Sequence, residues 1–130
     1  MGVVEAVLDA YAIVALLQDE AAAEQIEQTI ATGRAGASWV NLGEVYYLLA
    51  RRGGHSAAAA AVERVSRRIL TDEPSAASIV AAAGIKARHR LSYAEAFAVE
   101  VAERHRAPLL TGDPEIVALA SEVTVVDLRG

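Results

Sequence analysis

Residues 3–18 read VVEAVLDAYAIVALLQ, and this stretch decides the fold. The segment Val3–Leu8 is short, mostly apolar and rich in valine, which predicts a strand. It stops at Asp9, and a helical pattern of apolar residues follows over Tyr11–Gln18. We therefore expect a strand that passes directly into a helix, with an acidic residue at the junction.

The same alternation of short apolar segments and helical patterns continues along the chain. It predicts an α/β fold, a three-layer α/β/α sandwich whose central sheet is mostly parallel. Right-handed crossovers then place the carboxyl ends of the strands along one edge, where open α/β sheets bind ligands. We find no repeat or linker, so residues 1–130 are expected to form a single domain. Further strands are predicted at 37–40, 68–71, 108–110 and 122–126. Further helices are predicted at 20–32, 41–53, 56–68 and 92–105, and another is capped by Ser75 and runs through the alanines, with a break at Gly84.

Composition excludes several classes of protein. The 130 residues include no cysteine, which excludes disulfides and thiolate metal sites. The N-terminus lacks the basic region of a signal peptide, and no run of about 18 apolar residues is long enough to span a membrane. We therefore expect a cytoplasmic protein that does not associate with membranes.

The charge is distributed unevenly. Residues 51–90 hold eight basic and three acidic side chains, a net charge of +5 in a chain whose total is −5. An acidic protein with a basic middle is not an obvious nucleic-acid binder, although such a segment can face phosphates. The alternative is a solvated helix face.

Two acidic residues end predicted strands at the ligand-binding edge of the sheet. Asp9 follows the first strand, and Asp113 follows the strand at 108–110 and precedes Pro114. Each also occupies a position where an acid caps the next helix, and the sequence leaves both interpretations open.

Two more acids lie on helices in apolar surroundings. Glu44 shares a helix face with Val40, Tyr47 and Leu48, and Glu95 lies within the segment AEAFA. Solvation or a capping box between Asn41 and Glu44 is the structural alternative. Acids on apolar stripes are costly unless something compensates for their charge.

All four acids are expected near one edge of the sheet. Carboxylates that approach closely repel one another, so they are protonated or bind a cation. A set of oxygen ligands without cysteine indicates a hard divalent ion, Mg²⁺ or Mn²⁺. The corresponding reaction class is phosphodiester hydrolysis.

Four segments resemble the motifs of the PIN-domain family. They are VLDA at 7–10, NLGEV at 41–45, LSYAEAFA at 91–98 and LLTGD at 109–113. The motifs occur in the family's order and cover nearly the whole chain. The short length resembles VapC-type toxins rather than larger PIN nucleases.

The resemblance implies an endoribonuclease that needs Mg²⁺ or Mn²⁺ and cuts single-stranded regions of RNA. It also implies a homodimer that acts as the toxin of a type II toxin–antitoxin system and is neutralised by a VapB-like antitoxin. By motif match, the catalytic and metal-binding acids are Asp9, Glu44, Glu95 and Asp113, with Thr111 as the family's hydroxyl residue. The basic residues expected to hold RNA are Arg51, Arg52, Arg67, Arg68 and Arg88.

The chain departs from the family pattern at two positions. Glu95 stands where the third motif usually has aspartate, and Tyr11 stands where a small hydroxylic residue is common. The additional methylene of Glu95 extends the carboxylate by about 1.5 Å, and Mg²⁺ tolerates distorted geometry poorly. The departures bear on catalytic strength and not on the fold.

Three other functions compete with this interpretation. Phosphoryl-transfer α/β proteins also place an acid after the first strand, but no second acid adjoins Asp9 and no lysine ends a late strand. A non-catalytic PIN-like scaffold that binds RNA or a partner is the second. An RNA-processing nuclease outside a toxin–antitoxin system is the third.

Overall fold

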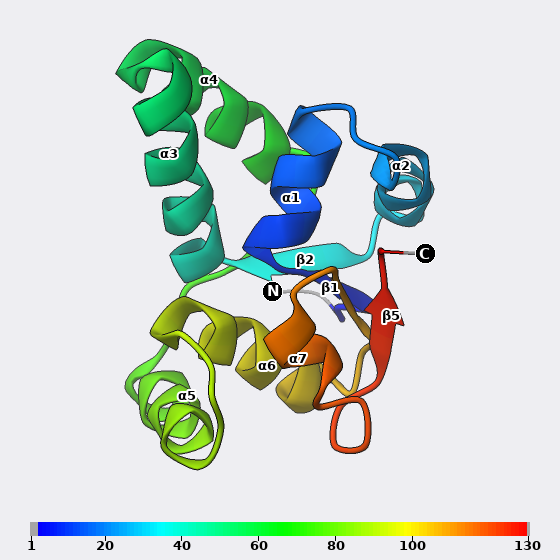
Figure 1. The fold of residues 1–130 in the computed structure, drawn as a ribbon, viewed down its shortest axis with the longest axis vertical. Helices are drawn as coiled ribbons and strands as arrows, with labels where there is room; N and C mark the ends of the chain where they lie inside the picture. Colours follow the sequence, from blue (N-terminus) through cyan, green and yellow to red (C-terminus); the bar gives the residue numbers. More distant parts are fainter. Residues whose placement is uncertain (1–2, 130) are drawn as a thin grey trace.

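A five-stranded parallel sheet organises the computed structural model, which describes residues 3–129 (Figure 1). The first strand lies in the middle of the sheet, and each neighbouring pair of strands is parallel. The strand order is β3 (Leu70–Asp72), β2 (Ala35–Ser38), β1 (Ala6–Leu8), β4 (Leu109–Thr111) and β5 (Val125–Asp127).

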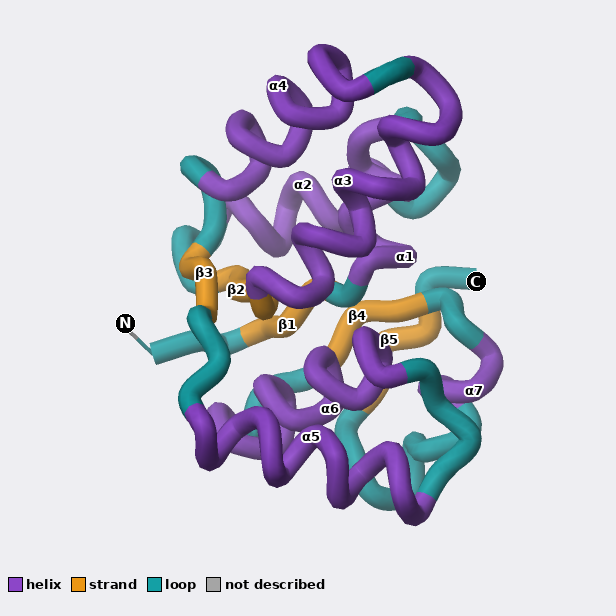
Figure 2. The backbone as a smooth tube through the Cα atoms, turned by 90° about the vertical axis from the view of Figure 1, so that its left-hand side faces the viewer, coloured by secondary structure: helices purple, strands orange, loops and turns teal. Residues whose placement is uncertain are grey.

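Helices cover both faces of the sheet, as Figures 1 and 2 show. One face carries α1 (Ala10–Leu17), α2 (Ala23–Ala31), α3 (Trp39–Gly53) and α4 (His55–Ser66). The other carries α5 (Ala76–Arg88), α6 (Tyr93–His105) and α7 (Pro114–Val117). The predicted three-layer α/β/α sandwich is therefore confirmed. Within residues 3–129, none of the helices has the length and apolar character needed to cross a membrane.

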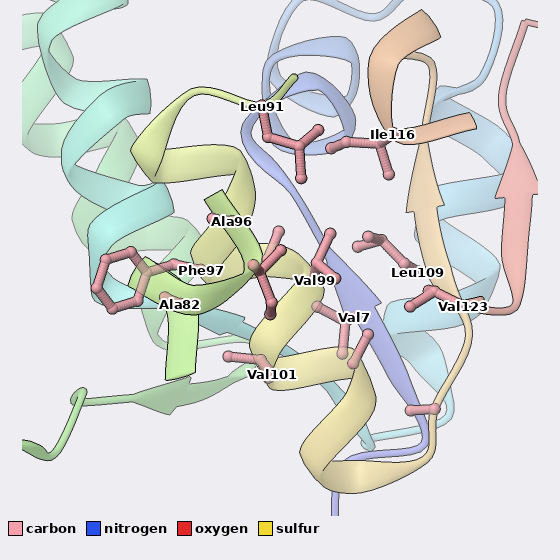
Figure 3. Packing of buried hydrophobic residues seen from close by; sticks show 14 of the residues in the cluster. Val7, Ala82, Leu91, Ala96, Phe97, Val99, Val101, Leu109, Ile116 and Val123 are labelled. Atoms are coloured by element: carbon pink, nitrogen blue, oxygen red, sulfur yellow. The ribbon is translucent and has the colours of Figure 1, made fainter. Parts of the chain in front are cut away.

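The strands divide the core into two clusters because successive side chains of a strand point to opposite faces. Val7 of β1 and Leu109 of β4 pack with α6, where Val99 points toward these strands (Figure 3). Leu8, the next residue of β1, belongs to the cluster beneath α1, α2 and α3. This alternation buries the sheet on both sides and leaves its carboxyl edge for other contacts.

The start of α3 differs from the prediction. Ser38, the last residue of β2, caps the helix by accepting a hydrogen bond from the backbone N–H of Val40 at 3.1 Å. Asn41 is therefore not the N-cap, and a capping box between Asn41 and Glu44 is wrong. The helix begins earlier because pairing with β1 and β3 ends β2 at Ser38.

Two further details of the helices also differ. The chain turns from α3 into α4 at Gly54, whose φ of 89° favours glycine, and Ser56 is not the cap. Helix α5 continues through Gly84 without a break. An internal glycine costs a helix only about 1 kcal/mol, which the packing of α5 on α6 offsets.

An ion network joins α6 to the end of β3. Arg104 donates to both carboxylate oxygens of Asp72, at 3.0 and 2.9 Å, and to both oxygens of Glu100, at 3.0 and 2.9 Å. Asp72 and Glu100 are each only 6% exposed. Buried carboxylates need such a partner, so Arg104 is expected to be important for stability.

Candidate active site

Asp9 and Asp113 lie at the carboxyl edge of the sheet, each directly before a helix. Asp9 caps α1, where its Oδ1 accepts a hydrogen bond from the N–H of Ala12 at 2.8 Å. Asp113 caps α7, where its Oδ1 accepts from the N–H of Glu115 at 2.8 Å. Both capping interpretations are confirmed. They leave other roles open, because a carboxylate has about four acceptor positions.

Glu44 and Glu95 reach the same edge from α3 and α6. Glu95 forms a capping box with Ser92: its Oε1 accepts from the N–H of Ser92 at 2.7 Å, and the Ser92 hydroxyl accepts from the N–H of Glu95 at 3.1 Å. Sequence analysis missed this role, although serine followed three residues later by glutamate is the signal for it. Glu95 thus has a structural function beside any chemical one.

The four predicted acids surround one hollow of about 320 Å³. Its lining comes from α1, α3, α6 and the segment after β4, so residues far apart in sequence meet there. The residues that line it include Asp9, Glu44, Glu95, Asp113, Tyr11, Asn41 and Arg52.

A fifth acid, which the sequence did not single out, lies beside them. One carboxylate oxygen from each of Glu95, Asp113 and Glu115 lies within 4.8 Å of the others. Glu115 is in the first turn of α7, two residues after Asp113. Nothing local distinguishes it from an ordinary acid at a helix start, where acids are common.

Burial and mutual repulsion make the carboxyls of Asp9, Glu44 and Glu95 hold protons unusually well. Burial raises the pKa of Asp9 to about 7, with a smaller contribution from the charges of Asp113 and Glu44. Burial also raises the pKa of Glu95 to about 7, and its contact with Asp113 adds to the effect. The pKa of Glu44 is raised for the same two reasons, burial and Asp113. A bound cation would stabilise the ionised form of these carboxyls and so offset the free-energy cost of their burial and repulsion.

The donor set suits a hard divalent cation. All the charged donors are carboxylates, the ligands that Mg²⁺ and Mn²⁺ prefer. Asn41 also lines the hollow, and its amide oxygen is buried and has no hydrogen-bond partner among the described residues. The residues present therefore fit the predicted metal.

Comparison with known proteins identifies the fold family. A family model described as PIN domain matches residues 6–122. The chain belongs to the PIN-domain family. No curated protein matches it by sequence.

Solved PIN-domain structures resemble the whole chain. DNA-bound VapBC from Salmonella typhimurium superposes with a TM-score of 0.77 at 14% identity, covering 96% of this chain and 98% of that one. VapC20 of Mycobacterium tuberculosis, a sarcin–ricin loop cleaving toxin, has a TM-score of 0.74 at 22% identity, covering 95% and 99%. A toxin–antitoxin complex from Klebsiella pneumoniae has a TM-score of 0.70 at 16% identity, covering 95% and 98%.

Thr111, at the hydroxyl position of this PIN domain, lies beneath the acids. It is fully buried, and its Oγ1 accepts a hydrogen bond from the N–H of Asp113 at 2.9 Å. The same side chain hydrogen-bonds Asp9, which lowers the pKa of that carboxyl against the effect of burial. Thr111 therefore holds the two strand-end acids relative to each other.

The unusual Tyr11 packs directly over Gly112. A Cβ added at Gly112 would lie 2.2 Å from Cζ of Tyr11, closer than any real contact. A side chain at Gly112 would therefore displace the partly exposed Tyr11 ring. The tyrosine ring therefore forms part of the wall of the hollow, and its size is matched by the absence of a side chain at Gly112.

The predicted basic residues are not gathered at the hollow. Arg52 lines it, whereas Arg51 stacks on Tyr47 with its Cζ 5.1 Å from the ring centroid. Arg67 pairs with Glu63 on α4, Arg68 pairs with Glu27 on α2, and Arg88 lies on α5 across the sheet. Contact of these five with RNA stays a prediction.

The raised pKa values predict how stability changes with pH. The folded protein keeps protons that the unfolded chain has released, so without metal its free energy of unfolding falls as pH rises through about 7. We expect a loss of about 2 kcal/mol between about pH 5 and about pH 8, mostly from Asp9, because Glu95 is more exposed.

Urea unfolding in EDTA across this pH range tests the prediction. Asp9→Asn should remove most of the slope, and excess Mn²⁺ should reduce it because the cation competes with protons. Stability that rises steadily over this range would contradict the assignment.

Proposed function

We propose that this PIN domain, taken as residues 1–130, is a metal-dependent endoribonuclease that cuts single-stranded regions of RNA. The observation that carries the proposal is the convergence of four acids, one from each family motif, around one hollow. Separate surface acids have no reason to meet there. A partly buried acid cluster in which Asp9, Glu44 and Glu95 have raised pKa values is typical of functional sites.

Asp9, Glu44, Glu95 and Asp113 would hold Mg²⁺ or Mn²⁺. When bound, a divalent ion polarises the phosphodiester and makes an attacking water more acidic. The protein contributes position: the helix caps orient Asp9 and Asp113, and the capping box with Ser92 orients Glu95. Thr111 keeps the two aspartates together.

Arg52 is the basic side chain best placed to face the substrate. It lines the same hollow as the acids, on the turn of α3 that lies two turns beyond Glu44. An arginine there offers up to two donors to one phosphate group. We propose that Arg52 contacts the RNA backbone, with the other predicted arginines as more distant candidates.

We further propose that the enzyme is the toxin of a type II toxin–antitoxin system. This rests on similarity in fold to VapBC complexes and to a toxin that cleaves the sarcin–ricin loop. Under this proposal the protein is cytoplasmic, forms a homodimer and is neutralised by a VapB-like antitoxin. Growth arrest upon expression of the chain alone, relieved by a small protein encoded beside it, is the expected result.

Cleavage of total RNA by the purified protein tests the activity. We expect cutting with Mg²⁺ or Mn²⁺ and none with EDTA, because the carboxylates alone repel the phosphate backbone. Fragment ends would then show the cut site. Absence of cutting with either metal, from folded protein free of antitoxin, would favour the non-catalytic scaffold.

A further inference from the structure

Asn41 opens the NLGEV segment, and because it is not the N-cap, the role of this buried polar residue needs another explanation. It lies in the first turn of α3, one turn before Glu44, and is 0% exposed. The side chain lines the acidic hollow. The N–H and C=O groups of a buried side-chain amide normally form hydrogen bonds. The partners of the Asn41 amide therefore indicate the role of this residue.

The orientation of the Asn41 amide is determined by its neighbour. Nδ2 donates a hydrogen bond to the carbonyl oxygen of Ala94 at 2.9 Å, linking α3 to the residue before Glu95. A carbonyl oxygen accepts only from a donor, so the nitrogen faces Ala94 and the oxygen occupies the other position of the amide. The Oδ1 atom is buried and has no partner among residues 3–129.

An unpaired buried carbonyl oxygen is destabilising, so a partner for it is expected. The Asn41 side chain lines the acidic hollow, where ionised carboxylates are poor partners because they only accept hydrogen bonds. A cation, or a water that a cation holds, supplies what is missing. Mg²⁺ in particular keeps several of its waters, which donate to nearby oxygens.

We propose that Asn41 belongs to the cation site and supplies a neutral oxygen through Oδ1, in addition to the acids. The inference rests on the proposed metal-dependent function. A neutral donor adds a contact without adding charge to a cluster whose carboxyls already repel one another. The Nδ2 bond to Ala94 holds the amide in this orientation.

Two substitutions distinguish the contribution of Oδ1 from that of the Nδ2 hydrogen bond. Asn41→Leu has similar size and removes both Oδ1 and the donor to Ala94. Asn41→Asp keeps an oxygen toward the hollow and also removes the donor. Mn²⁺ affinity, measured by calorimetry on each full-length protein, then reports on the oxygen, and circular dichroism with urea unfolding in EDTA reports on the fold.

We expect Asn41→Leu to weaken Mn²⁺ binding by at least about 10-fold, as is usual for lost outer-shell partners. Asn41→Asp should bind at least as tightly as the wild type, and both variants should remain folded in EDTA. Weakening of both variants alike would show that Asn41 acts only through the link between α3 and α6. Unchanged affinity in both would likewise overturn the inference.

Mn²⁺ binding and RNA cleavage by the wild-type protein distinguish failure of this inference from failure of the proposed function on which it rests. If wild-type protein binds Mn²⁺ and cuts RNA while Asn41→Leu binds equally well, the nuclease stands and the role of Asn41 fails. If the wild type binds no Mn²⁺, the metal centre fails and this inference fails with it.

Discussion

Asp9→Asn is expected to lower metal-dependent RNA cleavage by at least about 100-fold, the scale of losing a principal electrostatic group in an active site. The substitution removes a charge from the centre of the acid cluster and keeps the shape of the side chain. Asparagine caps helices as well as aspartate does, so the amide oxygen can still accept from Ala12. The fold should therefore survive while the activity is lost.

Initial rates with a defined single-stranded RNA, with either metal, measure this effect. Glu73→Gln is a matched control, because it removes one carboxylate charge from an exposed residue after β3 and away from the hollow. Its rate should stay near that of the wild type. Full activity in Asp9→Asn would remove Asp9 from the catalytic site.

The buried acid pair Asp72 and Glu100 leads to the second large effect. Arg104→Leu should lower the free energy of unfolding by about 3 kcal/mol, because it leaves Asp72 and Glu100 buried without a cation. The leucine keeps much of the packing of the arginine stem and a high helix propensity. A loss of this size is a large part of the stability of a small domain.

Chemical unfolding at neutral pH compares this variant with Arg67→Leu. Arg67 pairs with Glu63 on the surface of α4, and exposed pairs contribute at most about 1 kcal/mol. Adding Asp72→Asn and Glu100→Gln to Arg104→Leu should restore part of the loss by removing the unpaired charges. A cost below about 1 kcal/mol for Arg104→Leu would show that the network is not stabilising.

Local patterns were sufficient for the fold class. The strands at the middle of the sheet were predicted to within a few residues, because an apolar run that ends at an acid and leads into a helix is a signal within one segment. The four acids were found in the same way. Each interrupts an apolar pattern that its own neighbours define.

Errors came where a local rule competed with pairing between strands. Asn41 is a residue type that helix N-caps prefer. However, the pairing of β2 with β3 ends at Ser38, and Ser38 is the residue that caps α3. Asn41 therefore lies in the first turn of α3, and its side chain donates a hydrogen bond to Ala94 of α6. The hydrophobic pattern of residues 35–45 could not predict this contact, because Ala94 is distant in the sequence.

The sequence by itself determined the layers of the fold and the acids at the carboxyl edge, because side-chain direction follows from strand and helix periods. Tertiary packing determined which groups meet. It places Glu115 beside Glu95 and Arg52 at the hollow, whereas Arg68 pairs with Glu27 and not with the acids of the hollow. These meetings depend on how α3, α6 and α7 pack across the sheet, which is a property of the assembled chain. The free energy of bringing charges together is determined by that packing, and no single segment encodes it.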